Sequence, residues 1–154
     1  MYCSISDILT DLPRNEVINL ANDENRLESA INLNSGSDVL VVRVNNVISS
    51  SEEQINMYLR SRYTLPLTTV PARVKKYAVI ISIYNLYLRR FPVETPYSKE
   101  YSVVIAELKD IQRGLLHLDF PESEANSDTT GNYYVSNKAS TDRVFTDTLL
   151  DLYI

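Results

Sequence analysis

The chain has 154 residues, of which 44% are hydrophobic, which is enough for one core and too short for two ordinary domains. Its net charge is -5, and its single cysteine, Cys3, excludes a disulfide within the chain and fits a reducing compartment. The longest uncharged apolar run, Tyr77 to Leu88, is too short for a membrane-spanning helix of roughly 20 residues. No signal-peptide pattern stands at the start, so we expect a soluble protein with no membrane partner.

Glycine is scarce, with only three residues in the chain, and each falls between segments that carry a helical pattern. Such a composition fits helices better than a turn-rich sandwich. We therefore predict an all-α fold. A small helical bundle is expected over residues 1–118, followed by a flexible acidic linker and an extended C-terminal docking arm over residues 119–154.

Short helices are predicted at the N-terminus. Ser4 is a candidate N-cap with Asp7 three residues on, which is close to a capping box, and the first helix should end before Pro13. Asn15 to Leu20 can form a second short helix, and Glu24 to Leu33 one further weak turn.

The segment Asp38 to Val44 is rich in β-branched residues, and its local propensity alone is that of a strand. Apolar positions nevertheless recur at three and four residues over about six turns, and Asp38 stands where an N-cap belongs. The apolar residues are Val44, Val47, Ile48, Ile55, Tyr58 and Leu59, and Ser51 and Arg62 continue the same spacing. We predict one long helix over about 38–62, with a strand as the alternative for its first two turns.

A second long helix is predicted over about 71–90, where apolar residues lie on nearly every side. A helix with this pattern is usually buried in the middle of a bundle. A buried strand through Val79 to Ile83 is the alternative, but the apolar run is longer than a typical strand of about 5 to 6 residues.

A closing helix is predicted over about 96–114, because Thr95-Pro96 can cap and start it and Gly114 can end it in a left-handed conformation. Its apolar stripe consists of Tyr97, Tyr101, Val104, Leu108, Ile111 and Leu115.

Two prolines bound a corner between the long and the central helix. Leu65 and Val70 each precede a proline, which disfavours the α-region for both, so the long helix must stop near Tyr63. Pro71 suits the first turn of the next helix.

The segment from Asp119 to Gly131 is acidic and without periodicity, which is typical of a linker. Arg143 to Ile154 is apolar again. We interpret this last stretch as an arm that docks either on its own bundle or on another subunit.

The charges are distributed unevenly. Residues 54–93 contain no acidic residue and seven basic ones, namely Arg60, Arg62, Arg73, Lys75, Lys76, Arg89 and Arg90. This belt could meet an acidic partner, either nucleic acid or the acidic part of a neighbouring copy. Ordinary solvated charge at helix ends explains the same pattern.

The sequence offers little for catalysis. His117 is the only histidine, a pairing with Cys3 would involve the chain terminus, and the acidic run after Asp119 lacks the alternating ligands of a calcium loop. No two glycines lie near each other, so a phosphate-binding loop is missing. We expect no enzyme, no cofactor and no metal.

Several motifs resemble the neck protein family of Mu-like phages and prophages. The most specific is Tyr58-Leu59 with Arg62-Tyr63, Leu65-Pro66-Leu67 and Val70-Pro71. Further matching residues are Met1-Tyr2, Asp7-Ile8-Leu9, Ile55, Tyr84, Leu86-Tyr87, Arg89-Arg90, Tyr101, Leu108, Gly114, Leu118, Arg143-Val144-Phe145-Thr146 and Leu149. The chain departs from the family at Val39 to Val42 and in residues 119–138.

The resemblance implies a structural virion protein, made in the bacterial host cytoplasm and located in the virion neck. It would be related to head–tail connector or adaptor subunits that form a homo-oligomeric ring on the portal protein, with tail or head-closure proteins as further partners. DNA would pass through the ring without specific binding. The alternative is a nucleic-acid-binding helical module that places its basic residues on phosphates. The predicted subunit or partner interface comprises Arg60, Arg62, Tyr63, Arg89, Arg90, Arg143 and Phe145.

Overall fold

The computed structural model describes residues 1–91 and 95–118 of the chain. Within these ranges it contains five α-helices, one short 3₁₀ turn and no strand. The elements are α1 (Ile5–Asp11), α2 (Arg14–Ala21), η1 (Glu28–Ala30), α3 (Val39–Leu59), α4 (Ala72–Arg90) and α5 (Ser98–Arg113). The predicted all-α bundle is confirmed. The predicted linker and arm over residues 119–154 lie outside the described residues.

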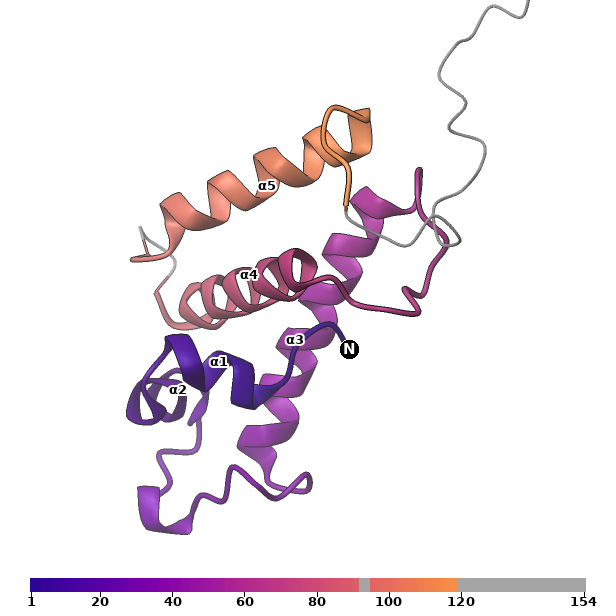
Figure 1. The fold of residues 1–154 in the computed structure, drawn as a ribbon. Helices are drawn as coiled ribbons and strands as arrows, with labels where there is room; N and C mark the ends of the chain where they lie inside the picture. Colours follow the sequence, from indigo (N-terminus) through magenta and orange to yellow (C-terminus); the bar gives the residue numbers. More distant parts are fainter. Residues whose placement is uncertain (92–94, 119–154) are drawn as a thin grey trace, which may run out of the picture.

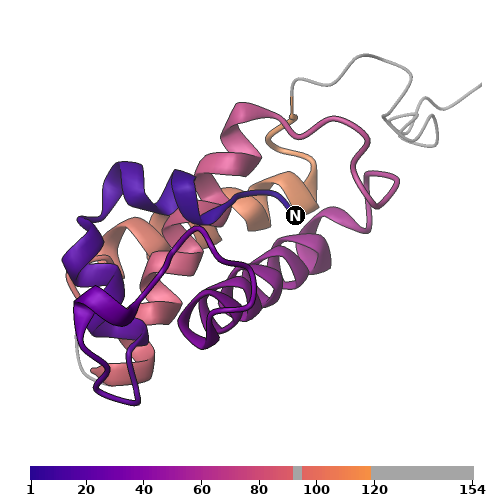
Figure 2. The same ribbon diagram turned by 90° about the horizontal axis from the view of Figure 1, so that it is seen from below.

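The central helix α4 lies between α5 on one side and the α1–α2 pair on the other (Figure 1). It contacts each of the other four α-helices, as predicted for a helix that is apolar on nearly every side. Seen from below, α3 forms a long rod along one edge of the bundle, beside α4 (Figure 2). Within the described ranges no helix is long and apolar enough to span a membrane.

The core is centred on α4 and its contacts with α3 and α5. Ile81, Ile83 and Leu86 of α4 are fully buried, and each such side chain contributes about 1.5–3 kcal/mol through removal of apolar surface from water. Leu88, at the end of the apolar run, lies in the last turn of α4 and is exposed.

The β-branched segment at the start of α3 is helical rather than extended. The Asp38 side chain caps the helix, because its Oδ1 accepts a hydrogen bond of 3.0 Å from the Leu40 amide. Leu40, Val41 and Val44 face the core, whereas Val42 is exposed, so burial of one face decides against a strand.

The long helix α3 ends at Leu59, three residues before the predicted end. The amides of Arg62 and Tyr63 both donate to the Leu59 carbonyl over 2.9 Å, which closes a turn in place of a continued helix. This turn leads into the corner, where the side chains of Tyr63 and Leu67 are buried in the core. Pro71 takes the N-cap position of α4 rather than a place in its first turn.

The N-terminal predictions also stand. Ser4 and Asp7 form a capping box at α1, with a 2.9 Å hydrogen bond from the Ser4 amide to the Asp7 carboxylate. The first helix ends at Asp11, before Pro13, and the weak turn expected between Glu24 and Leu33 is the 3₁₀ turn η1.

The closing helix α5 begins at Ser98, two residues after the predicted start. Thr95 does not occupy the N-cap position; its amide instead donates to Ser98 Oγ over 3.0 Å, which fixes the turn before the helix. Gly114 ends α5 with φ 81°, as predicted. Leu115 was wrongly placed in the apolar stripe, because it follows the helix and is exposed.

Candidate functional site

The predicted interface residues fall in separate parts of the structure. Arg89 and Arg90 lie in the last turn of α4, whereas Arg60, Arg62 and Tyr63 lie at its other end, in the corner that follows α3. Arg143 and Phe145 lie outside the described residues. The basic belt read from the sequence is therefore split between two ends of the bundle.

At the C-terminal end of α4, three arginines surround one aspartate. Asp23 Oδ2 lies 2.6 Å from Arg89 Nη2 and 3.1 Å from Arg43 Nε, and its Oδ1 lies 3.3 Å from Arg90 Nη2. Arg90 also donates to the Asn22 carbonyl over 2.6 Å. We call Asp23, Arg43, Arg89 and Arg90 the Asp23 cluster. It joins the loop after α2 to both α3 and α4.

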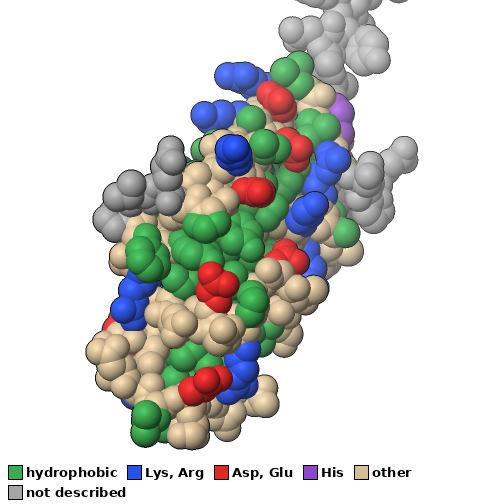
Figure 3. Space-filling model, turned by 90° about the vertical axis from the view of Figure 1, so that its left-hand side faces the viewer, with side chains coloured by type: hydrophobic (Ala, Val, Ile, Leu, Met, Phe, Trp, Pro, Cys, Tyr) green, Lys and Arg blue, Asp and Glu red, His purple; other side chains and the backbone are tan. Residues whose placement is uncertain are grey.

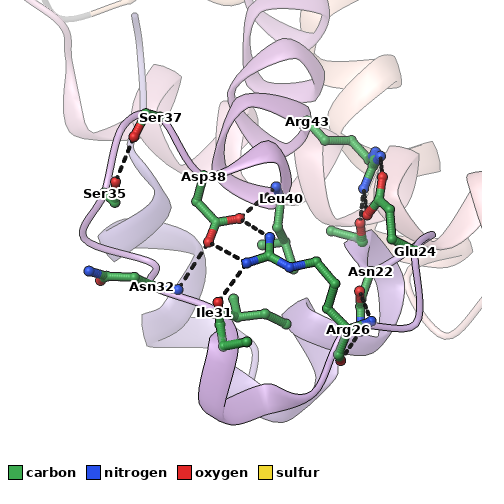
Figure 4. A network of polar contacts seen from close by, with 12 residues as sticks. Asn22, Glu24, Arg26, Ile31, Asn32, Ser35, Ser37, Asp38, Leu40 and Arg43 are labelled. Atoms are coloured by element: carbon green, nitrogen blue, oxygen red, sulfur yellow. Dashed lines mark hydrogen bonds and ion pairs between the residues drawn. The ribbon is translucent and has the colours of Figure 1, made fainter.

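A second carboxylate extends this cluster. Glu24 accepts a hydrogen bond from Arg43 Nη2 over 2.5 Å, and Arg43 Nη1 donates to the Ala21 carbonyl (Figure 4). The hydrogen bond from Arg43 holds the pKa of the Glu24 carboxyl below its usual value. Three guanidinium groups thus face the two carboxylates of Asp23 and Glu24, which leaves one positive charge in excess among these five side chains.

The loop that leads into α3 has a polar network of its own (Figure 4). Asp38 Oδ1 accepts from Arg26 Nη1 over 2.8 Å, and Asp38 Oδ2 accepts from the Asn32 amide over 3.1 Å. The backbone bond from Asn32, then the Arg26 side chain and the Leu40 amide hold the pKa of Asp38 below its usual value. The loop is therefore tied to the helix N-terminus that it precedes.

At the opposite end of α4, the corner is fastened to the end of α5. The guanidinium of Arg62 lies over Gly114, so close that a β-carbon on Gly114 would come within 2.1 Å of Arg62 Nη1. The Tyr63 hydroxyl accepts a hydrogen bond of 2.9 Å from the Leu118 amide. Both residues of the Arg62-Tyr63 motif thus have a role within the chain. Arg60 is exposed.

Two tyrosines of α4 donate hydrogen bonds to carboxylates on neighbouring helices. Tyr77 binds Glu107 of α5, and Tyr87 binds Glu16 of α2. Burial, and then the hydrogen bond to the carboxylate, raise the pKa of both hydroxyls above the usual value. These bonds secure α4 between its neighbours.

A groove runs between α4 and α5, with a volume of about 440 Å³. Its walls are the apolar parts of Tyr77, Ile80, Val103 and Val104, and its remaining lining residues are Arg73, Lys76, Lys99, Glu100 and Glu107. The face drawn in Figure 3 has hydrophobic side chains gathered across its middle, with acidic and basic side chains around them.

In the part of the chain that the structure describes, no three His, Cys, Asp or Glu residues are grouped so that they could hold a metal ion. Cys3 is buried with its Sγ 3.9 Å from Ser82 Oγ, and burial raises the pKa of its thiol. His117 is exposed.

Sequence reasoning missed the partners of the arginines. Asp23 was given no role, Glu24 was assigned only to the weak turn before Leu33, and Arg43 only to the β-branched start of the long helix. One signal was present, because Arg43 is the single charged residue between Asp38 and Glu52 and therefore interrupts an otherwise uncharged stretch.

The fold places the chain among small all-α proteins, with its ionic contacts concentrated where α4 and α3 meet the N-terminal loop. A family model described as "Bacteriophage Mu, Gp36" matches residues 2–137, and the chain belongs to this family. It is thus a protein of a Mu-like phage family, as the sequence resemblance implied. A search of curated proteins found no match.

Proposed function

We propose that this chain is a structural subunit of the virion neck, a head–tail connector that assembles as a ring on the portal protein. The observation that carries the proposal is the membership of the Mu Gp36 family, whose match over residues 2–137 includes every described helix. The role is mechanical and involves no catalysed reaction. The partners are further copies of the chain, the portal protein, and a tail or head-closure protein.

A ring needs a heterologous interface, in which one face of each copy meets a different face of the next. The Asp23 cluster supports this geometry, because it places an excess of arginine at one end of the bundle. The side chains of Arg89 and Arg90 are 32% and 35% exposed. A guanidinium group has five N–H donors, so both arginines can bind a carboxylate of a neighbour while they keep Asp23.

The overall charge supports the passage of DNA through such a ring. The chain has a net charge of -5, and acidic residues that line the channel repel the phosphate backbone. DNA then slides past without specific binding.

Deletion of the gene from the encoding phage tests the proposal directly. Lysates of the deletion strain should contain filled heads and complete tails that are not joined, as seen by electron microscopy, and the native gene supplied in trans should restore joined particles. Normal virions from the deletion strain would contradict the proposal.

Charge variants test whether the Asp23 cluster faces a partner. The double variant Arg89→Glu with Arg90→Glu should abolish joining, but it also breaks the contacts with Asp23 inside the chain. A triple variant that adds Asp23→Arg restores opposite charges within the cluster while the outward charge stays reversed. If the interface is intermolecular, the triple variant recovers thermal stability and still fails to join heads to tails. Recovery of joining would show that these arginines act only within the chain.

A second candidate function rests on a different observation. Arg60, Arg73 and Lys76 are exposed, and none forms an ion pair among the described residues. They could bind phosphates as a nucleic-acid-binding module. Other basic residues of the belt are already engaged, since Lys75 lies 2.8 Å from Asp7 and Arg89 2.6 Å from Asp23. Filter binding of duplex DNA at increasing salt separates the two functions: a connector binds weakly throughout, whereas a DNA-binding module loses affinity steeply.

A further inference from the structure

The groove between α4 and α5 exposes apolar surface. Val103 lies in the middle of α5 but is 57% exposed, whereas its neighbour Val104 is 3% exposed and faces the core. Val103 and the partly buried Ile80 form the open part of the groove. Among its charged lining residues, Arg73, Lys76 and Lys99 outnumber Glu100 and Glu107. A groove of this kind suits an amphipathic helix with apolar anchors.

We propose that residues 143–154 of the same chain dock in this groove as a helix. In this segment Phe145, Leu149 and Leu152 follow the spacing i, i+4, i+7 and therefore share one helical face. Asp147 and Asp151 fall on the opposite face, where they stay in water. The face formed by Phe145, Leu149 and Leu152 thus carries no charge and can supply the apolar anchors that the groove takes.

The point where the described chain ends supports docking on the same molecule. Leu118 lies against the start of α4, where it lines one hollow together with Arg73. Arg73 also lines the α4–α5 groove. Residues 119–142 can span up to roughly 80 Å when extended, whereas α4, with 19 residues, is only about 28 Å long. The segment can therefore reach any part of the groove without a second copy.

Charge supports the same path. The residues directly after Leu118 include four carboxylates, at Asp119, Glu122, Glu124 and Asp128. They follow Leu118, which lines a hollow together with Arg73, and opposite charges attract, so we expect Arg73 and Lys76 to draw these carboxylates toward the groove.

Disulfide trapping in the full chain tests the proposal. We would introduce Val103→Cys together with Leu149→Cys, both at positions whose change leaves the described core intact. The matched control is Val42→Cys with Leu149→Cys, because Val42 is exposed at 44% but lies on α3, outside the groove. The native Cys3 is 3% exposed and competes little for oxidation.

Mild oxidation should link positions 103 and 149 within one molecule at least about ten times faster than positions 42 and 149. Adding Phe145→Asp should slow the first pair to the rate of the control, because a charge at the anchor position prevents burial. Equal rates for the two pairs would overturn the proposal. A covalent dimer in place of the intramolecular link would overturn it as well, because the segment would then occupy the groove of another copy.

Discussion

The two ends of α4 are attached to the rest of the molecule by different kinds of interaction. At its N-terminal end, the corner residues Arg62 and Tyr63 lie against Gly114 and Leu118 through packing and a hydrogen bond between uncharged groups. One ion pair, between Lys75 and Asp7, adds to these contacts. At its C-terminal end, Arg89 and Arg90 form ion pairs with Asp23, whose side chain is 39% exposed.

The difference predicts how each end responds to its surroundings. Buried packing is little affected by salt, whereas ion pairs between exposed groups are screened and contribute about 0–1 kcal/mol. The corner therefore supplies stability, and the Asp23 cluster supplies a charged surface whose strength depends on salt. This division is what the proposed connector role requires, namely a shape that persists while the charged end binds a partner.

The largest loss of stability is expected from a substitution that leaves a cavity in the core beside the corner. Leu59, the last residue of α3, is fully buried, so Leu59→Ala should lower the free energy of unfolding by about 2–5 kcal/mol. Met57→Ala in the same helix is the control, because Met57 is 69% exposed, and it should change stability by less than about 0.5 kcal/mol. Urea unfolding measures both. A loss for Leu59→Ala that disappears at high salt would contradict the assignment of this end to packing.

A smaller effect at the same end is expected from Gly114→Ala. Gly114 has φ 81°, a left-handed conformation that costs other residues about 1–2 kcal/mol, and the Arg62 side chain must also move aside. Gly36→Ala is the control, since nothing lies within 4 Å of a β-carbon there and Gly36 has no positive φ. If thermal unfolding shows that both variants lose the same amount of stability, the contact between Arg62 and Gly114 does not stabilise the corner.

The helices of the bundle could be predicted because each one rests on local patterns. The spacing of buried residues such as Ile48, Ile55 and Leu59 identified α3 despite its β-branched start, and the capping residues Ser4 and Asp38 marked where helices begin. The ends were less accurate, because hydrogen bonds in turns, such as that from Thr95 to Ser98, compete with the first helical turn.

The contacts of the candidate site could not be predicted in the same way. Arg89 lies 66 residues from Asp23 along the chain, and only the packing of α2 and α3 against α4 brings the two together. Sequence reasoning therefore found the basic residues but not what they bind. It also missed the contact of Tyr63 within the chain, where the buried side chain accepts a hydrogen bond from the Leu118 amide.

At the C-terminal end of α4, Asp23→Asn should lower the free energy of unfolding modestly, by an amount that depends on salt. The substitution leaves Arg43, Arg89 and Arg90 close together without their shared carboxylate, and we expect a loss of about 0.5–1 kcal/mol at low salt that vanishes near 1 M salt. Glu53→Gln is the control, because Glu53 is exposed and forms no ion pair among the described residues. Unfolding in urea at the two salt concentrations measures the difference. An effect that persists at 1 M salt would mean that this end, too, relies on packing.

The smallest change in stability is expected from the protonation of Asp38, the N-cap of α3, as the pH falls. Its pKa is lowered from the usual 3.8 by the Asn32 amide, Arg26 and the Leu40 amide. Because the folded state holds this carboxyl ionised more strongly than the unfolded chain does, the stabilisation is complete above about pH 4 and is lost as the pH falls through the folded pKa. Asp38→Asn keeps a good N-cap but removes the charge that binds Arg26. The variant should therefore be less stable than the native chain at pH 7, and the gap should narrow at pH 3.

Asp11→Asn serves as the control for this measurement, because it removes an exposed carboxylate that forms no ion pair among the described residues. Circular dichroism during urea unfolding at pH 7, 5 and 3 follows all three proteins. A gap between native chain and Asp38→Asn that is as wide at pH 3 as at pH 7 would show that the capping geometry of Asp38, and not its charge, stabilises the start of α3. The ionic contribution to stability in this part of the molecule would then be confined to the Asp23 cluster, the surface that we propose for contact with a neighbouring subunit.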